Sequence, residues 1–495
     1  MLPETLWCLI WATLAATQAP RKLPLNSNSA FSPENIPNPP VFTLPPAANL
    51  TISVALCSST NSPARFLVTN SSTSSVPDSR GGKDVFEIEY TDGLGIWSGN
   101  LVNGGVLAVE DLGQTSFEVG LSDQDPIHGL QSDTDLPLLG DTTSSQALIF
   151  SPAFSEIHYY VPKWPNYTFP PANLSQPPLP SGLPNYTLVI SPTSSTPSLT
   201  SIPRTGCMLL SQKSMGTISN ESLWLRDISG WRTQWLLEGL VPSTNYTAYV
   251  IQNSAQVRGP IYFATKSASF ACPLVYGLPY CPGVAYPVPL PQLPETSGSR
   301  VYTAANIPEQ ITAPLISYLR NFTVTLSTFA CGRDMYSPIV TCADCQRAYR
   351  KWLCSITFTR CGEPSPANPT SFTNTAPDTG ATGLNALQPK DPNNPSAPQK
   401  VFSALLAQST DISKARSPTL PAMGSPYYML LPCLETCNAV DRACPPFVGF
   451  TCPTSQFNAA ASYGVGYIDS ADGDQGQGAT GGSQDRWGNI WCNGG

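Results

Sequence analysis

The residues with the most chemical potential in this sequence are its 15 cysteines. Cys342 and Cys345 have the spacing of a thioredoxin-type redox pair or of half a zinc site. A redox pair needs a βαβ context, and a zinc site needs further reduced ligands. The sequence provides neither, and its two histidines are His128 and His158. We therefore interpret the cysteines as structural disulfides and expect no metal and no cofactor.

Hydrolytic chemistry is also disfavoured by the histidines. Neither lies near a Gly-X-Ser-X-Gly elbow or in a His-Glu-X-X-His helix. We expect no catalytic residues and no enzymatic activity, although a glycosidase carboxylate pair is a three-dimensional arrangement that the sequence leaves open. Two acidic stretches lack the spacing of a twelve-residue Ca²⁺ loop and are interpreted as solvated turns, with ion binding as a minor hypothesis: Asp123, Asp125, Asp133 and Asp135, and Asp469, Asp472 and Asp474.

The composition points to the secretory pathway. Residues 1–19 have the length and apolar character of a signal peptide, and the 52 prolines and 12% charged residues fit a loop-rich extracellular chain. A net charge of -8 excludes a basic stripe for nucleic acid. Cleavage would remove Cys8 and leave an even set of fourteen cysteines for disulfides: Cys57, Cys207, Cys272, Cys281, Cys331, Cys342, Cys345, Cys354, Cys361, Cys433, Cys437, Cys444, Cys452 and Cys492.

Asn-X-Ser/Thr sequons support the same compartment. We expect N-linked glycans at Asn49, Asn70, Asn166, Asn173, Asn185, Asn220, Asn245 and Asn321. After the signal peptide no stretch of about 18 uninterrupted apolar residues suggests a membrane-spanning helix. Membrane association is therefore expected through a partner.

The elements that position these residues fall into β-rich and helical parts. Short runs between turn residues, several of them alternating, predict strands at Leu50–Cys57, Phe66–Thr69, Val85–Tyr90, Gly105–Glu110, Phe117–Leu121 and Ala147–Phe150, as in an antiparallel sandwich or jelly roll. A second all-β unit begins near Tyr186. There Leu240 and Tyr246 resemble the strand-entry corner of fibronectin type III domains, and the tryptophans Trp224, Trp231 and Trp235 are interpreted as buried core.

Cysteine pairing stays open at this level. Cys272 and Cys281 could close a local loop, and Cys57 and Cys207 could bridge the two β units. From Ile311 onward apolar residues recur every three or four positions and predict an amphipathic helix. Cys342–Cys354 and Tyr427–Cys444 are also predicted to be helical.

The expected organisation is multidomain, with two all-β domains followed by a mainly α, disulfide-rich domain. Its predicted parts are a signal peptide 1–19, a proline-rich leader 20–46, a sandwich or jelly-roll-like domain 47–161, a linker 162–183, a fibronectin-III-like sandwich 184–270, a proline-rich connector 271–305, and a cysteine-rich helical domain 306–495 with a flexible insertion 362–400 and a flexible tail 464–484.

The cysteine block resembles a frizzled-type cysteine-rich domain. In that family a helix ends in Phe/Trp-Leu-Cys-Ser with a cysteine seven residues on, and a later helix reads Pro-Cys-X3-Cys-X6-Cys. Trp352-Leu353-Cys354-Ser355 with Cys361, and Pro432-Cys433-X3-Cys437-X6-Cys444, match these elements.

Taken over the whole chain, the motifs resemble the family of fungal stretch-activated calcium channel components, the mating-induced-death proteins. The matching segments are Cys342-Ala-Asp-Cys-Gln-Arg-Ala-Tyr-Arg-Lys-Trp-Leu-Cys354, Leu431-Pro-Cys-Leu-Glu-Thr-Cys437 and Cys444 to Pro453. The block is also similar to the cysteine-rich auxiliary subunits of animal sodium-leak channels.

The resemblance implies a non-enzymatic accessory subunit of a voltage-gated-like calcium channel. It would dock on the extracellular face of a large four-repeat pore subunit, at the plasma membrane or in the endoplasmic reticulum, and support Ca²⁺ influx. Tyr349, Arg350 and Lys351 are possible contacts, and a solvated helix face is the alternative for them. The alternative function is a secreted or cell-surface module that binds a lipid or a glycan.

Overall fold

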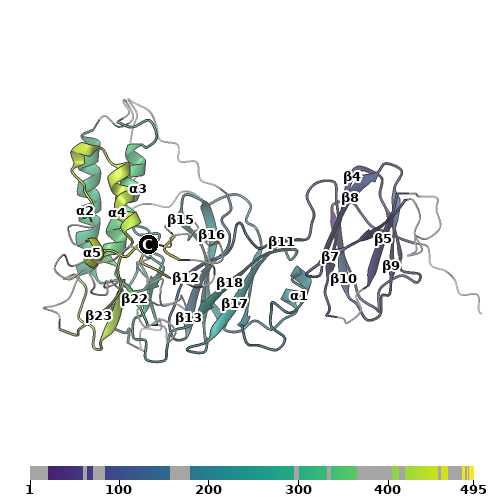
Figure 1. Cartoon of the computed structure of the whole chain (residues 1–495), viewed down its shortest axis with the longest axis horizontal. Coiled ribbons are helices and arrows are strands. Elements are labelled where there is room, and N and C mark those ends of the chain that lie inside the picture. The colour runs from purple at the N-terminus through teal and green to yellow at the C-terminus, as the bar shows by residue number, and fades with distance from the viewer. Residues whose placement is uncertain are drawn as a thin grey trace, which may run out of the picture. The chain divides into compact units, whose positions relative to one another are not determined.

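The described part of the chain forms two compact units (Figure 1). The computed structural model describes residues 20–59, 64–70, 84–155, 179–294, 300–329, 331, 336–364, 404–411, 419–454, 459–466, 482–484, 486, 488 and 490–495. The predicted signal peptide 1–19, most of the linker 162–183, the insertion from 365 and the tail residues 467–481 lie outside these residues, as do Asn166 and Asn173. The first unit contains the chain up to Leu130, Leu199–Gln212 and Asn253–Val257, and the second contains Gln131–Ser198, Lys213–Gln252 and Arg258–Gly495.

The first unit is a β-sandwich of two five-stranded sheets. One sheet has the order β1 (Arg21–Lys22), β3 (Val41–Leu44), β9 (Gly105–Glu110), β5 (Arg65–Thr69) and β6 (Val85–Ile88). The other has the order β2 (Ser27–Phe31), β10 (Phe117–Ser122), β4 (Ala47–Leu56), β8 (Leu94–Leu101) and β7 (Tyr90–Thr91). Side chains from both sheets form one hydrophobic cluster, in which Phe66 lies edge-on to Phe117 with ring centroids 4.9 Å apart.

The segment predicted as a proline-rich leader is part of this sandwich. Residues 20–46 supply β1, β2 and β3, and Phe31 and Phe42 are buried in the cluster between the sheets. The prolines lie between the strands, where they remove no hydrogen bond from the sheet, so the apolar residues of the strands can pair and be buried. The first domain therefore begins earlier than position 47.

The second unit contains a second sandwich. In one sheet β18 (Gln256–Ala264), β17 (Asn245–Gln252) and β14 (Tyr186–Pro192) are neighbours in that order. The other has the order β12 (Leu138–Thr142), β13 (Gln146–Phe150), β16 (Gly230–Glu238) and β15 (Thr217–Asp227). The short strand β11 (Gly129–Gln131) precedes this sandwich in the chain, and the helix α1 (Gly206–Leu210) belongs to the first unit.

The structure draws the boundary between the two sandwiches differently from the predicted position 161. Strand β13 pairs with β16 in antiparallel register, so it belongs to the second sandwich. All of its residues are buried, because Ala147 and Ile149 face the sandwich core while Leu148 and Phe150 face a second cluster. Partner choice of this kind is a long-range property that strand patterning does not encode.

The corner predicted at Leu240 is present. The backbone N–H of Val241 donates to the hydroxyl of Tyr246 at 2.9 Å, and Leu240 and Tyr246 are both buried. Trp224, Trp231 and Trp235 are buried as well, as predicted. The local sequence thus indicated these core positions correctly.

The segment predicted as a connector, 271–305, is instead an integral part of the second unit. It supplies the short sheet of β20 (Tyr286–Pro287), β19 (Leu274–Val275) and β21 (Val301–Tyr302). Leu274 packs against the outer face of the second sandwich, and Leu278 packs on the side that receives the helices. The many prolines fix turns in a segment whose aliphatic and tyrosine side chains are buried.

Helices gather in the C-terminal part of the second unit (Figure 1): α2 (Glu309–Ser327), α3 (Cys342–Thr357), α4 (Leu434–Ala443), the 3-10 helix η3 (Pro446–Val448) and α5 (Ala459–Ser462). The predicted helix from Ile311 is confirmed by α2, which buries Ile311, Leu315, Leu319 and Leu326. The predicted helix from Tyr427 begins only at Leu434. Residues Tyr427–Leu430 form strand β24 between β22 (Arg360–Gly362) and β23 (Leu405–Gln408), and Pro432 separates this strand from α4.

Seven disulfides cross-link the chain, each within one of the two units. Cys57–Cys207 lies in the first unit, which contains both segments, rather than between two β domains. The suggested local loop of Cys272 and Cys281 does not form, because packing of the 271–305 segment brings each of them to a different partner. The other six pairs lie in the second unit: Cys272–Cys361, Cys281–Cys354, Cys331–Cys342, Cys345–Cys444, Cys433–Cys492 and Cys437–Cys452.

The chain is therefore mostly β-sheet with a disulfide-rich helical part, as predicted at that level. The jelly-roll-like, fibronectin-III-like and frizzled-like assignments stay predictions.

Candidate interaction surface

One end of the helix pair α3 and α4 combines tight cross-linking with exposed apolar side chains. Thr341 caps α3 in a reciprocal capping box with Asp344, and Cys345 in the first turn is bonded to Cys444 at the end of α4. The loop before α3 and the loop after α4 therefore lie at the same end of the pair. We call Tyr336–Thr341 and Cys444–Gly449 the disulfide-framed end.

Two apolar side chains at the disulfide-framed end are almost fully exposed. The relative exposure is 87% for Ile339 and 91% for Phe447, the highest values among the large hydrophobic residues that the structure describes. The Tyr336 hydroxyl donates to the carbonyl of Ala443 and ties the loop before α3 to the end of α4. Because Cys331–Cys342 and Cys345–Cys444 fix the backbone at the base of the loops, the side chains cannot easily turn into the core. Exposed apolar groups on a rigid frame are typical of protein contact sites.

An aromatic cluster lies below this end. Tyr349 of α3 stacks on Phe322 of α2 with ring centroids 3.6 Å apart, and Trp352 lies edge-on to Phe450 at 4.8 Å. The indole N–H of Trp352 donates to the hydroxyl of Tyr463 at 3.0 Å. This packing joins α2, α3 and the chain after α4.

The structure separates the three side chains predicted as contacts on α3. Tyr349 belongs to the aromatic cluster and Arg350 is buried, whereas Lys351 is exposed. Three consecutive helix positions point in different directions, so they cannot form one exposed face. Ile339 and Phe447 were missed because Ile339 lies in a loop and Phe447 in the three-residue helix η3, where no apolar periodicity marks them.

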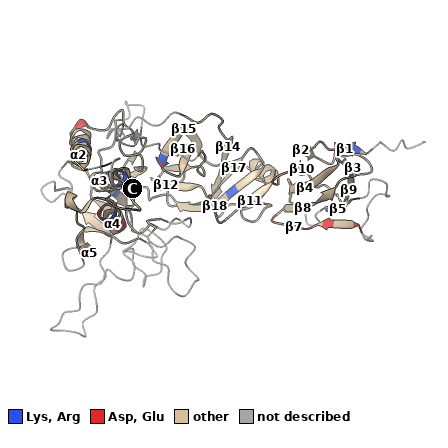
Figure 2. Ribbon diagram, turned by 90° about the horizontal axis from the view of Figure 1, so that it is seen from above, with Lys and Arg blue, Asp and Glu red and all other residues tan. Residues whose placement is uncertain are grey.

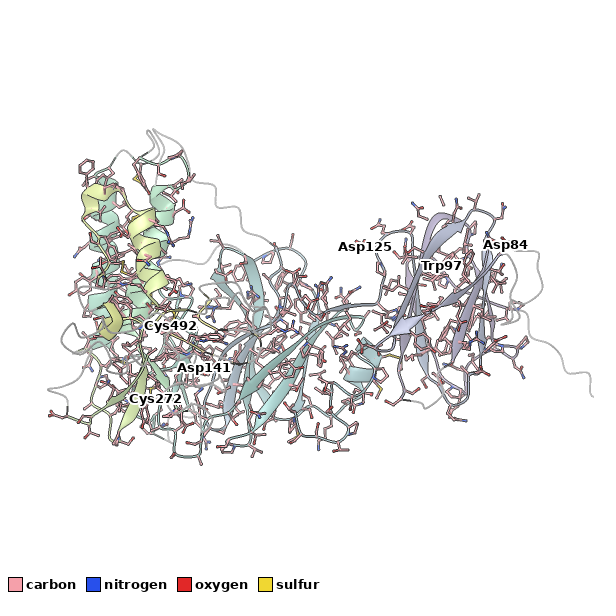
Figure 3. The ribbon with its side chains drawn as sticks, in the orientation of Figure 1. Asp84, Trp97, Asp125, Asp141, Cys272 and Cys492 are labelled. Carbon is pink, nitrogen blue, oxygen red and sulfur yellow. A yellow bond between two sulfur atoms is a disulfide. The ribbon has the colours of Figure 1, made fainter. Side chains whose placement is uncertain are left out.

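A buried ion cluster connects the second sandwich to the cysteine-rich part. The carboxylate of Asp141 (labelled in Figure 3) accepts from Lys266 Nζ at 2.8 Å and from Arg360 Nε at 2.6 Å, and all three side chains are at most 5% exposed. Burial acts to raise the pKa of Asp141, but Arg360 and Lys266 hold it below the usual value of 3.8. Burial lowers the pKa of Lys266 to about 8 in spite of Asp141. The arrangement is structural, because breaking one partner would leave buried charge unpaired.

A Ser-His-Glu arrangement in the first unit has the connectivity of a catalytic triad. His128 Nδ1 lies 3.0 Å from Ser53 Oγ, and His128 Nε2 lies 3.1 Å from Glu118 Oε2. Burial acts to raise the pKa of Glu118, but hydrogen bonds from His128 and Asn28 hold it below its usual range. Ser53 is 0% and His128 1% exposed, so a substrate cannot reach the hydroxyl. We interpret the arrangement as a polar clasp between β4, β10 and the segment that holds His128.

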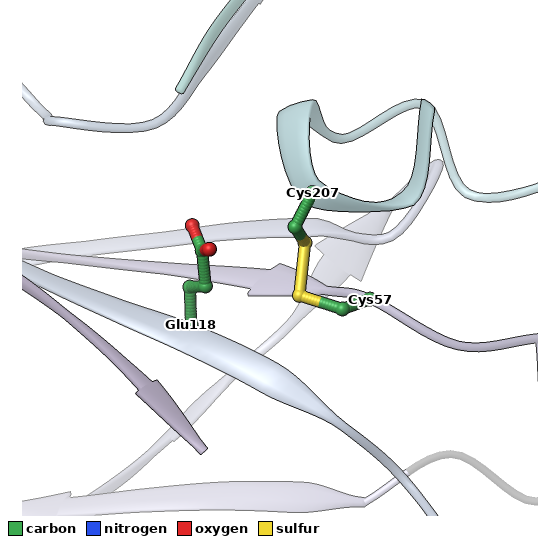
Figure 4. Close-up of side chains that lie close together, drawn as sticks. All are labelled: Cys57, Glu118 and Cys207. Carbon is green, nitrogen blue, oxygen red and sulfur yellow. A yellow bond between two sulfur atoms is a disulfide. The ribbon is translucent and has the colours of Figure 1, made fainter. Parts of the chain in front are cut away.

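Two groups of side chains in the described residues have the proximity of metal ligands, but both contain disulfide sulfurs. Figure 4 shows one of them, in which Glu118 lies beside the Cys57–Cys207 bond. The other combines Glu435 with the Cys433–Cys492 bond. A disulfide sulfur is not a thiolate and does not offer the ligand that a metal needs.

The acidic stretch from Asp123 to Asp135 spreads over the surface. Arg258 pairs with Asp135 at 3.9 Å, and Arg486 pairs with Asp133 at 3.5 Å. The second acidic stretch, Asp469 to Asp474, lies outside the described residues. Charged positions are isolated along the ribbon (Figure 2), in keeping with the low charged fraction of the sequence.

The six sequon asparagines that the structure describes are all exposed: Asn49, Asn70, Asn185, Asn220, Asn245 and Asn321. Their exposure leaves room for a glycan at each position. Within the described residues, helices long and apolar enough to span a bilayer are not found.

Comparisons with known proteins agree on one family. The family model described as "Stretch-activated Ca²⁺-permeable channel component" matches residues 50–479. The stretch-activated cation channel MID1 of Cryptococcus neoformans var. grubii is 32% identical over an aligned length of 554 residues. The alignment covers 97% of this chain and 86% of that protein. The stretch-activated cation channel yam8 of Schizosaccharomyces pombe is 28% identical over 57% of this chain and 52% of that protein.

Among solved structures, the chicken CNTN1 FN1–FN3 domains match 41% of this chain and 54% of that chain, at 12% identity and a TM-score of 0.15. A score this low carries no argument about the fold.

Proposed function

Because the chain belongs to the family of stretch-activated Ca²⁺-permeable channel components, we propose that it is a non-enzymatic, extracellular accessory subunit of a voltage-gated-like calcium channel. In this role it docks on the extracellular face of a large four-repeat pore subunit and supports Ca²⁺ influx. The chain stays at the membrane through this partner. Family membership is the observation that carries the proposal.

An extracellular position is supported by the disulfides and the sequons. Seven disulfides in one chain persist only in an oxidising compartment. The exposed sequon asparagines, of which Asn321 lies on α2 of the helical part, are compatible with N-linked glycans. We propose that residues 1–19 direct the chain into the secretory pathway and that the protein works at the plasma membrane.

The disulfide-framed end is the docking surface we propose for the pore subunit. Complete burial of Ile339 and Phe447 in a partner would contribute about 1.5–3 kcal/mol for each side chain. The disulfides at the base of the loops reduce the conformational entropy that is lost on binding. Large apolar side chains near the centre of an interface commonly dominate its affinity.

The proposal is tested by affinity purification of the tagged protein from detergent-solubilised fungal membranes. We expect a large polytopic channel protein to co-purify, and reconstituted protein without this partner to pass no Ca²⁺ current. If no polytopic channel is recovered, the subunit proposal fails and the alternative of a surface binding module is favoured. If the isolated chain conducts Ca²⁺, the accessory role is wrong.

A further inference from the structure

A polar pocket lies where the turn between β12 and β13 meets the segment after β18. Its volume is about 650 Å³, within the range of small-ligand sites. Its described lining residues come from four stretches, and their side chains include Ser144, Ser145, Phe270, Gln292 and Arg300. All of these stretches belong to the second unit.

Two of the lining stretches are held to the rest of the second unit. The N–H of Lys266 donates to the carbonyl of Thr143 at 3.0 Å, and the N–H of Leu240 donates to the carbonyl of Ser145 at 3.0 Å. Cys272 (labelled in Figure 3), another lining residue, is bonded to Cys361 next to the ion cluster of Arg360. These two stretches are thus preformed, and a ligand would not have to order them.

The lining combines three kinds of recognition group. In the described part of the chain, the hydroxyls of Ser144 and Ser145 and the guanidinium of Arg300 have no hydrogen-bond or ion-pair partner. Phe270 is half-buried and offers an apolar ring. The described residues that line the pocket include neither Asp nor Glu, although the whole chain has a net charge of -8. Arg300, which is exposed, is therefore the charged group among the described lining residues.

We propose that this pocket binds an acidic saccharide, a sugar that carries a carboxylate or a phosphate ester. The guanidinium of Arg300 would donate to the acidic group through its planar N–H fork, which matches both anions. Ser144 and Ser145 would exchange hydrogen bonds with sugar hydroxyls, and Phe270 would cover an apolar face of the ring. The pocket is separate from the disulfide-framed end. A negative result for saccharide binding would therefore not bear on the docking proposal.

The test is calorimetric titration of the full-length protein with trigalacturonate, mannose 6-phosphate and the neutral maltotriose. We expect saturable binding of at least one acidic sugar, and the arm that binds identifies carboxylate or phosphate as the recognised group. Arg300→Gln should weaken that binding about tenfold or more, because a hydrogen bond to a charged group is lost. Arg320→Gln, an exposed arginine on α2, is the matched control and should leave the affinity unchanged.

Three results would overturn the proposal. The first is no saturable binding of either acidic sugar by a folded protein. The second is equal weakening by Arg300→Gln and Arg320→Gln. The third is binding of maltotriose as tight as that of the acidic sugars.

Discussion

The sandwich of the first unit holds one continuous hydrophobic cluster and a single disulfide, whereas the helical part of the second unit divides its buried side chains between two clusters and is cross-linked repeatedly. In the sandwich, two sheets bury both of their inner faces against each other. In the helical part, α3 (16 residues) and α4 (10 residues) pack through cysteines and, on α3, through aromatic rings. The comparison indicates that packing stabilises the first region and that covalent constraint stabilises the second.

Removal of a disulfide from each region should separate these two means of stabilisation most clearly. In the chain-entropy model, loss of Cys345–Cys444, with a sequence separation of 99, costs about 4.7 kcal/mol, and loss of Cys57–Cys207, with a separation of 150, costs about 5 kcal/mol. Despite these similar costs, we expect Cys345→Ala/Cys444→Ala to unfold α3 and α4, while Cys57→Ala/Cys207→Ala leaves the sandwich folded. Hydrogen exchange measured by mass spectrometry on peptides from α3, α4, β4 and β10 reports each region. Equal loss of protection in both regions would contradict the comparison.

A cavity in the core of the first sandwich should destabilise that sandwich and leave the helical part folded. Phe66 is fully buried between the sheets, so Phe66→Ala should destabilise the first unit by about 3–5 kcal/mol. Denaturant unfolding followed by hydrogen exchange should show protection lost from β4 and β10 and retained in α3. Phe86→Ala, at a residue 42% exposed, is the control and should have little effect.

Loss of one charge from the buried ion cluster should strongly destabilise the second unit. Asp141→Asn removes the charge that pairs Lys266 and Arg360 and should destabilise the second unit by at least about 3 kcal/mol. Asp135→Asn, whose side chain is 76% exposed in a long ion pair, should change stability by less than about 1 kcal/mol. Thermal unfolding of both variants measures the difference. Similar melting temperatures for the two variants would show that the cluster does not stabilise the unit.

Acid should weaken the second unit through the same carboxyl group. The pKa of Asp141 in the folded protein lies below its unfolded value of 3.8, so the unfolded state binds more protons in this range. The stabilisation is present above pH 3.8 and is lost as the pH falls through the folded pKa. One such group changes the free energy of unfolding by at most about 1.4 kcal/mol per pH unit. Urea unfolding between pH 5 and pH 2 should give a shallower pH slope for Asp141→Asn than for the wild type, and parallel slopes would contradict this assignment.

Local patterns predicted individual elements well. Strand β9 follows directly from a short apolar run, and the apolar face of α2 from a repeat of three to four residues. The Leu240 and Tyr246 corner could also be predicted, since its hydrogen bond spans only five residues.

Long-range partners could not be predicted in the same way. Strand β13 has apolar residues on both faces, so its sequence does not say which sandwich it joins. Cys272 and Cys281 are near each other in sequence, but packing of their segment against α3 and β22 pairs Cys272 with Cys361 and Cys281 with Cys354. The polar pocket and the exposure of Ile339 and Phe447 depend on loops from separate stretches and leave no periodic signal.

The most direct test of the central claim compares docking by the two regions. Full-length Ile339→Asp/Phe447→Asp alters the disulfide-framed end, and Ile96→Asp/Val102→Asp alters exposed apolar residues of the first sandwich, which are 46% and 62% exposed. Each protein is affinity-purified from solubilised membranes, and the recovered channel partner is quantified by mass spectrometry. We predict that the first variant loses the partner while the second retains it. Full recovery with the first variant, or loss with the second, would contradict the proposal that the helical part docks through this end.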